Sequence, residues 1–447
     1  MADRRLLQGG TVLSLDPKVG NFEKGDLLIE GSKIAAVGPE IHADDAEIID
    51  ASNTIVMPGF VDTHRHLWEG ILRNIGTDVP LEGDVSYLAF ILNVLAPVYR
   101  PEDVYIANLV SAYGALDAGI TTILDWSHIQ TTTEHTDATV EALRASGMRA
   151  VFAYGNPWWK FPEEDQDDWF RDAASRYFSS KDQLLTLGYA PPGPEFTPFE
   201  IAQGHWELAR EVGAHLTVHV GVGSFGKNDK VGEMGRAGLL GPDTTYIHCT
   251  TLSDDEVQII VDTGGTFSLA CPVEMMMGHG MPPTQKFLDR GLAPSLSVDV
   301  ETNVPGDMFT QMRSALSLQH ALIFDQQLSG AQEVPATATS RDAISWATIE
   351  GARANALEDK VGSLTPGKEA DVIMLRTDRI NVLPVNDPIG AVVWGMDTSN
   401  VDSVWVAGDA KKRDGELVGV DVTSVGRKAT ESRDYVVQTS GFALPQI

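Results

Sequence analysis

The chain runs from an apolar strand into a histidine pair at Ile55-Val56-Met57-Pro58-Gly59-Phe60-Val61-Asp62-Thr63-His64-Arg65-His66. Pro58 and Gly59 mark a turn where the strand begins. Side chains alternate along a strand, so His64 and His66 lie on one face, about 6.6 Å apart. That separation suits two imidazoles that bind one metal ion through bonds of about 2.0–2.1 Å. A polar strand end with two exposed imidazoles is the alternative, and ligands at other strand ends decide between them.

The middle of the chain alternates between expected strands and expected helices. With the strand before His64, the pattern predicts eight strands, the others at Thr121–Trp126, Arg149–Tyr154, Leu184–Tyr189, Ala214–Val220, Thr244–Cys249, Thr266–Ala270 and Pro294–Val300. Helical periodicity lies between them, for example at Pro101–Ala118, Thr136–Ser146, Pro198–Val212 and Ser253–Thr263. Thr197 and Ser253 are expected to cap the last two helices. Eight such units are typical of an α/β fold, the (β/α)₈ TIM-type barrel.

Both ends of the chain have a different sequence pattern from the middle. Residues 5–57 and the segment after residue 365 carry short strand-like runs separated by turns, such as Leu27–Glu30 and Val401–Gly408. We therefore expect one small composite β-sandwich domain built from residues 1–57 and 365–447. The metal-dependent catalytic barrel is expected at residues 58–364.

The composition excludes several classes of partner. The 447 residues carry a formal net charge of −30, which repels nucleic acid and anionic membranes. Cys249 and Cys271 lie in apolar runs and provide neither a disulfide framework nor a thiolate cluster. Residues 1–30 lack a signal-peptide pattern, and no apolar run is long enough to span a bilayer. We expect a cytoplasmic homo-oligomer that acts on a small molecule, with no nucleic-acid or membrane partner.

Ligand-type residues recur at the ends of the expected strands. Barrel enzymes carry their chemistry at the carboxyl ends of strands, and these positions hold His64, His66, His219, His248 and Asp299. Each has a structural alternative, because strand-end histidines are often hydrogen-bonded and an aspartate can cap a helix. Together they predict a metal site at the mouth of the barrel.

The order of these motifs resembles that of the amidohydrolase superfamily, in its cytosine-deaminase-like or atrazine/triazine hydrolase branch. The matching pieces are Pro58–His66, Ala118–Thr122, His219, His248, Asp299, Asn355–Leu357 and Gly362–Asp371. The resemblance implies that one metal ion is held by His64, His66, His219 and Asp299. It also implies that Asp299 acts as the general base and that His248 contacts the attacking water or the substrate.

The resemblance also bears on the number and kind of metal ions. No lysine stands at the end of the fourth strand, Leu184–Ala190, where binuclear relatives carry a bridging carbamylated lysine. One divalent ion is therefore expected. Zinc is the default for three histidines and one aspartate, with Fe²⁺ or Mn²⁺ as alternatives.

One position departs from the family pattern. Ring deaminases usually carry glutamate three residues after the histidine of the fifth strand, where it protonates a ring nitrogen, and Val222 stands there instead. This argues against an ordinary cytosine or guanine deaminase. Asp299 is one alternative proton route, and other pocket candidates are Glu301, Glu274, His279 and His128. Each of these four is otherwise a solvent-facing loop residue.

We predict a hydrolase that uses metal-activated water to cleave a C–N or other C–heteroatom bond of a small cyclic or aromatic substrate. Asp299 and His248 are the expected catalytic residues. Substrate contacts are expected from His248, His279, His128, Trp68 and Glu301. The alternatives are a decarboxylase or hydratase on the same metal site and a non-catalytic scaffold protein.

Overall fold

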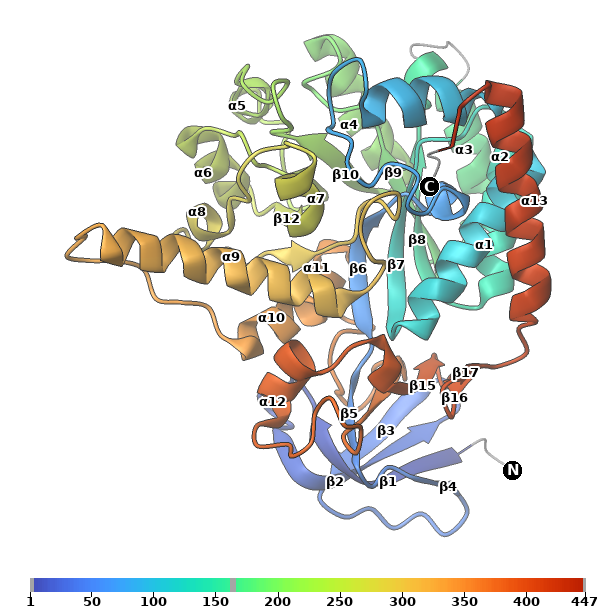
Figure 1. Ribbon diagram of the computed structural model, residues 1–447, viewed down its shortest axis with the longest axis vertical. Helices are drawn as coiled ribbons and strands as arrows, with labels where there is room; N and C mark the ends of the chain where they lie inside the picture. The colour runs from blue at the N-terminus through green and yellow to red at the C-terminus, as the bar shows by residue number, and fades with distance from the viewer. Residues whose placement is uncertain (1–3, 161–165, 445–447) are drawn as a thin grey trace.

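The computed structural model describes residues 4–160 and residues 166–444. Figure 1 shows a strand barrel surrounded by helices, and below it a sheet to which both ends of the chain contribute. Within the described residues, no helix is both long enough and apolar enough to cross a membrane.

The barrel has eight parallel strands, arranged in the order in which they occur along the chain. They are β6 (Phe60–Arg65), β7 (Ile120–Ser127), β8 (Arg149–Gly155), β9 (Leu185–Ala190), β10 (His215–Val220), β11 (Thr244–His248), β12 (Thr266–Leu269) and β13 (Ser295–Leu296). The predicted (β/α)₈ barrel is confirmed. Only β13 is much shorter than expected, because strand pairing beyond Leu296 gives way to an irregular segment.

Backbone and side-chain hydrogen bonds close the barrel between β6 and the segment after β13. The Asp299 N–H donates to the His64 carbonyl, and the His66 N–H donates to the Asp299 carbonyl, both at 2.9 Å. The Val298 N–H donates to the buried Asp62 carboxylate at 3.1 Å. We call this line of bonds, formed by residues 62–66 and 298–299, the barrel seam.

Helices surround the barrel and extend from it. They are α1 (Pro101–Asp117), α2 (Thr133–Ser146), α3 (Gln166–Tyr177), α4 (Phe199–Val212), α5 (Lys230–Arg236), α6 (Asp254–Asp262), α7 (Cys271–Met276), α8 (Thr284–Leu288), α9 (Met308–Leu328), α10 (Ser340–Trp346), α11 (Ile349–Ala354), α12 (Pro388–Gly390) and α13 (Val422–Ser440). Short 3₁₀ or π turns occupy Leu67–Ile71, Leu88–Leu95, Ala96–Val98, Trp158–Lys160, Ala391–Gly395 and Thr398–Asn400.

The two expected helix caps have different outcomes. For α6 the prediction is confirmed, because the Ser253 hydroxyl accepts from the Glu256 N–H, and the Glu256 carboxylate accepts from the Ser253 N–H. For α4 it is wrong. The Thr197 hydroxyl donates to the Gly193 carbonyl at 2.9 Å, so it does not cap the helix.

Nine strands from both ends of the chain form one mixed sheet, as the expected composite domain requires. They are β1 (Arg4–Leu13), β2 (Asn21–Glu30), β3 (Lys33–Gly38), β4 (Glu47–Asp50), β5 (Thr54–Pro58), β14 (Val372–Arg376), β15 (Val401–Val406), β16 (Asp409–Arg413) and β17 (Glu416–Leu417). The two ends meet where β14 pairs antiparallel with β5. Gly59 then leads into β6, and only glycine fits, because a Cβ there would lie 2.2 Å from the Thr121 side chain.

Several contacts hold the barrel to the C-terminal part of the chain. The Arg149 guanidinium on β8 donates twice to the Asp371 carboxylate next to β14, each time at 3.0 Å, and both side chains are buried. Helix α13 returns to the barrel and runs beside α1 (Figure 1). There the Arg100 guanidinium lies 3.5 Å from the ring centre of Tyr435.

Candidate metal centre

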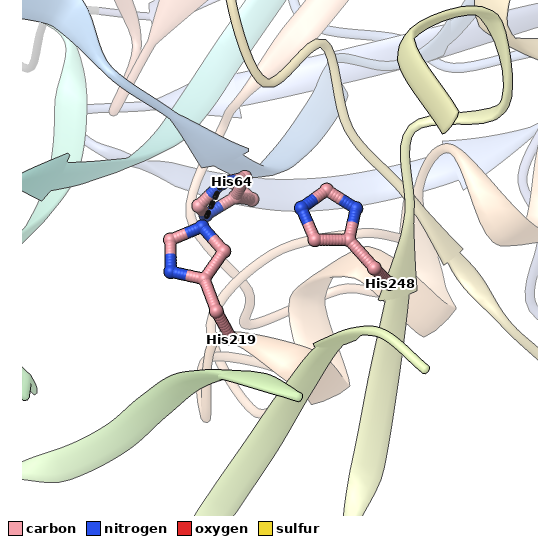
Figure 2. Close-up of side chains that lie close together, drawn as sticks. All are labelled: His64, His219 and His248. Atoms are coloured by element: carbon pink, nitrogen blue, oxygen red, sulfur yellow. Dashed lines mark hydrogen bonds between the residues drawn. The ribbon is translucent and has the colours of Figure 1, made fainter. Parts of the chain in front are cut away.

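The five predicted donors meet at the carboxyl end of the barrel. Strand β6 contains His64 and leads directly into His66, while β10 contains His219 and β11 ends in His248. Asp299 comes from the barrel seam. Figure 2 shows the rings of His64, His219 and His248 grouped together.

Four of the donor atoms have the spacing of metal ligands. Asp299 Oδ1 lies 3.1 Å from His64 Nε2 and 3.3 Å from His66 Nε2. The Nε2 atoms of His64 and His219 are 3.2 Å apart. Ligands bonded at about 2.0–2.1 Å to a tetrahedral ion lie about 3.3 Å from one another. Three pairs of these donor atoms therefore have the spacing expected around a divalent cation, and the compact donor groups are His64 with His66 and Asp299, and His64 with His219 and His248. His248 Nε2 approaches the other carboxylate oxygen of Asp299, Oδ2, at 3.7 Å.

Hydrogen bonds at Nδ1 orient the rings of two of the histidines. The Nδ1 of His66 lies 2.8 Å from the Trp126 carbonyl and donates its proton there, which leaves Nε2 free to face the donor cluster. The Nδ1 of His248 lies 3.1 Å from Oε1 of Glu274, and both of these side chains are buried. Glu274 is thus a partner of His248 and does not face solvent as a loop residue.

The charge states of three of the four predicted ligands suit a cation. For the fourth, His66, burial is outweighed by the neighbouring Asp299 and Glu69 carboxylates, which raise its pKa. Burial lowers the pKa of His64 to about 3 and holds the pKa of His219 well below its usual range. Burial opposes ionisation of Asp299, but the adjacent imidazoles of His64 and His66 outweigh it and hold the pKa of this carboxyl well below its usual range. Neutral imidazoles and an ionised carboxylate are the forms that bind metals.

Two of the site residues have strained backbones. His248 and Asp299 have φ values of 70° and 68°, in the left-handed region that non-glycine residues rarely occupy. Such a conformation costs about 1–3 kcal/mol and persists only where the surrounding structure enforces it. Strain of this kind clusters at functional sites.

A cavity of about 390 Å³ adjoins the donors, a size typical of small-molecule sites. Its wall consists of His66, Leu81, Tyr87, Leu88, Leu92, Trp126, His128, Asn156, Pro192, Phe196, His219, Val222, Phe225, His248, Met277, His279, Asp299 and Val300. Among these described residues there is no lysine or arginine, and Asp299 is the one carboxylate. The cavity is therefore suited to an uncharged, largely apolar molecule.

The residues predicted to contact substrate fall into two groups. His248, His128 and His279 line the cavity. Within the described part of the chain, the wall does not include Trp68 or Glu301. The Trp68 indole N–H donates to His128 Nδ1 at 3.3 Å from behind the wall. The Glu301 carboxylate accepts from Arg73 at 2.8 Å and also bonds the Ser111 hydroxyl, so it turns away from the cavity.

Sequence reasoning missed several polar residues beside the cavity. The Tyr87 hydroxyl donates to Oε1 of the buried Glu69 at 2.5 Å, and burial raises the pKa of Glu69 to about 8. Asn156 directly follows β8, and its Oδ1 is buried with no partner among the described residues. The strand-end criterion that identified His219 would also have identified Asn156. Glu69 lies only three residues after His66, and this proximity to a predicted donor could have identified it.

Comparisons with known proteins identify the family of this chain. The family model for the amidohydrolase family matches residues 55–411. The 5-methylthioadenosine/S-adenosylhomocysteine deaminase of Symbiobacterium thermophilum is 30% identical over 411 residues, which covers 88% of this chain and 89% of the relative. The 5′-deoxyadenosine deaminase of Methanosarcina mazei is 27% identical, with 97% of this chain and 98% of the relative covered.

Solved structures support the same fold. A zinc-bound adenosine deaminase from Xanthomonas campestris has a TM-score of 0.87 at 20% identity, covering 98% of this chain and 99% of that one. An atrazine chlorohydrolase mutant from Arthrobacter aurescens TC1, complexed with zinc and atraton, has a TM-score of 0.85 at 20% identity, with 96% and 100% covered. The resemblance expected from the sequence is confirmed, and the chain belongs to the amidohydrolase family.

Proposed function

We propose that this protein is a metal-dependent hydrolase that uses activated water to cleave a C–N or other C–heteroatom bond of a small cyclic or aromatic molecule. The observation that carries the proposal is the set of three imidazole nitrogens and one carboxylate oxygen whose neighbours lie 3.1–3.3 Å apart. This set opens onto a mostly apolar cavity.

The proposed ligands of one divalent ion are His64, His66, His219 and Asp299. Zinc is the proposed ion, with Fe²⁺ or Mn²⁺ as alternatives, because the donor set suits zinc and solved structures of similar fold contain it. The ion supplies Lewis acidity, which lowers the pKa of a coordinated water towards about 7.

The other roles belong to the chain itself. Asp299 is the proposed general base, since its ionised Oδ2 is the carboxylate oxygen that faces His248. His248 is the proposed contact to water or substrate. His128 and His279 are proposed to touch the substrate from the cavity wall. Trp68 is proposed to act indirectly, by a hydrogen bond that orients the ring of His128. Glu301 is proposed to act indirectly as well, by its position in the same segment as Asp299.

The proposed substrate is an uncharged heteroaromatic ring that loses an exocyclic amino or substituted amino group. Leu81, Leu88, Leu92 and Phe225 give the wall an apolar character, and burial of such side chains against a flat ring favours binding. The names of the nucleoside deaminases that cover nearly the whole chain support an amine as the leaving group. Val222 supports a second candidate, displacement of a group such as chloride that leaves without a proton.

The finer features of organisation are also proposals. The two cysteines are free and buried, which suits the cytoplasm. Exposed Leu322, Phe324 and Leu328 on α9 support a homo-oligomer, which light scattering after size-exclusion chromatography tests. The proposed division is a barrel at 58–364 and a composite domain at 1–57 and 365–447.

A substrate screen on zinc-reconstituted protein tests the function. The panel contains 5′-deoxyadenosine, 5′-methylthioadenosine, alkylamino-substituted and chloro-substituted s-triazines, and cytosine and guanine as expected poor substrates. Release of ammonia, amine or chloride is measured in ¹⁸O-labelled water. Incorporation of ¹⁸O into the product supports hydrolysis, whereas turnover without label would indicate a decarboxylase-type reaction. Rapid release of ammonia from cytosine or guanine would contradict the expectation that Val222 argues against an ordinary cytosine or guanine deaminase.

A further inference from the structure

Two side chains of the cavity wall have a polar atom with no hydrogen-bond partner. Among the described residues that line the cavity, these atoms are Oδ1 of Asn156 and Nδ1 of His279, and both are buried. A buried polar atom without a hydrogen bond destabilises a protein unless a ligand or a water molecule satisfies it. These are therefore the two positions where a bound molecule would complete the hydrogen bonding of the wall.

The other amide-like and hydroxyl groups of the described wall already bond the protein itself. The indole N–H of Trp126 donates to the Thr217 carbonyl at 3.2 Å, and the Tyr87 hydroxyl donates to the carboxylate of Glu69. A substrate can form a hydrogen bond with either of these two groups only by breaking the bond that exists. The substrate therefore gains most from the two atoms that have no partner.

The open atom of Asn156 has a fixed chemical requirement. A carbonyl oxygen only accepts hydrogen bonds, whereas Nδ1 of a neutral imidazole can donate or accept. Asn108, Asn303 and Asn355 also have a buried Oδ1 without a partner among the described residues, but they are not part of the cavity wall. Of these four open acceptors, Asn156 is the one that a molecule in the cavity can reach.

The backbone around Asn156 is held from two sides. Asn156 directly follows β8, whose last residue, Gly155, pairs with Ala190 at the end of β9. A Cβ on Gly155 would lie 3.0 Å from the backbone nitrogen of His128, so the end of β8 packs closely against the segment that follows β7. Pro157 comes next, and the residue before a proline is restricted towards extended conformations. The carboxamide is therefore positioned before any ligand binds.

We propose that Asn156 is a specificity-determining residue whose Oδ1 accepts a hydrogen bond from an N–H group of the substrate. The substrate is then an uncharged heteroaromatic ring that presents an N–H donor towards the carboxyl end of β8. The inference rests on the proposed function, because it places the substrate in the cavity beside the metal centre. Asn156 takes no part in bond making or bond breaking. It selects between rings by binding.

The test compares two rings that differ in one group. The probe 2-ethylamino-4,6-dimethylpyrimidine has an N–H where 2-ethoxy-4,6-dimethylpyrimidine has an oxygen, and the two molecules have nearly the same shape. Dissociation constants are measured by calorimetry on zinc-reconstituted protein. The ethylamino ring should bind at least about 10-fold more tightly, because the ether oxygen leaves the Asn156 carbonyl without a donor. Equal affinities, tighter binding of the ethoxy ring, or no measurable binding of the ethylamino ring would overturn the proposal.

Variants at position 156 assign this preference to the carboxamide. Asn156→Leu removes the acceptor with little change in volume and should lower the preference for the ethylamino ring at least about 10-fold. Intrinsic differences between the two rings, such as the basicity of the ring nitrogens, persist in the variant and cancel in this comparison. Asn156→Ala removes the same oxygen and gives a second measurement if leucine disturbs the fold. A preference that survives in both variants would overturn the proposal.

The matched control is Asn108→Leu, the same change at a buried asparagine of α1 outside the cavity wall. Its Nδ2 donates to the Val104 carbonyl at 2.8 Å, and its Oδ1 has no partner among the described residues, as in Asn156. This variant should keep the preference of the parent protein. An equal loss of preference in Asn108→Leu would mean that the effect reflects general destabilisation, and it would overturn the proposal.

The outcomes separate recognition from catalysis. If the protein prefers the ethylamino ring through Asn156 but turns over no compound in the substrate screen, the proposed function fails and the recognition by Asn156 stands. If it hydrolyses compounds in the screen while the preference does not depend on Asn156, the recognition fails and the proposed function stands.

Discussion

Replacement of Asp299 by asparagine separates the two roles proposed for this residue. The carboxylate contributes one oxygen to the donor cluster, at 3.1 Å from His64 and 3.3 Å from His66, and it is proposed to accept the proton of the attacking water. Asparagine has nearly the same size and keeps one oxygen that can face the same two rings. It cannot accept a proton. We therefore expect Asp299→Asn to retain zinc, more weakly than the parent protein, and to lose activity.

The size of the loss follows from the missing proton transfer. A positioned general base contributes about 10²–10⁴-fold to the rate, so kcat should fall at least about 100-fold. This corresponds to about 2.7 kcal/mol of activation free energy. A second loss from weaker zinc binding is separated by measuring kcat per bound zinc.

Zinc content by mass spectrometry and kcat are measured together in one metal-buffered solution. The matched variant is His248→Asn, which removes a ring outside the four proposed ligands. It should keep zinc content closer to normal while kcat falls. Near-normal kcat from zinc-loaded Asp299→Asn would refute the reasoning, because the base would then lie elsewhere in the site.

Four further outcomes are expected. His219→Ala should fold normally but lose stoichiometric zinc, as measured by mass spectrometry, because three donors hold the ion too loosely; full zinc content would contradict this. Arg149→Met should lower the free energy of unfolding by about 3–5 kcal/mol, because it leaves the buried Asp371 charge unpaired, and Arg149→Met/Asp371→Leu should recover much of that loss in denaturant titrations. Burial raises the pKa of Glu195 to about 7, so its contribution to stability is lost as pH rises from about 4.5 through 7. Glu195→Gln should therefore gain in Tm relative to the parent protein over that range. A Tm difference that stays constant with pH would contradict this prediction. Val222→Glu should not raise kcat on the native substrate, and a gain would mean that the pocket is a degraded deaminase site.

Local sequence patterns predicted the barrel well. Strand periodicity and the rule that barrel chemistry lies at strand ends depend on short stretches of chain, and the residues that they singled out lie in two donor groups that share His64, one with His66 and Asp299 and one with His219 and His248. The cavity wall was harder to predict. Leu81, Leu88 and Leu92 come from the long connection between β6 and α1, and no local pattern indicates where such a segment packs.

The two misplaced substrate contacts have the same physical cause. Trp68 and Glu301 both lie next to metal-donor segments in sequence, so proximity suggested that they face the substrate. Their actual directions depend on distant partners. Trp68 packs against Tyr99 and bonds His128, and Glu301 pairs with Arg73, 228 residues away. Contacts of this kind become visible only in the folded chain.

The barrel seam links the assembly of the site to the order of folding. The bonds between His64 and Asp299 join residues 235 positions apart in the chain, so they are among the contacts with the highest entropic cost of closure. A nascent chain that lacks its eighth strand has only part of the proposed donor set, even though His64, His66 and His219 have already been synthesised. We therefore expect high-affinity zinc uptake to be a late event that reports completion of the barrel. A bound ion would in turn stabilise the barrel seam against local unfolding.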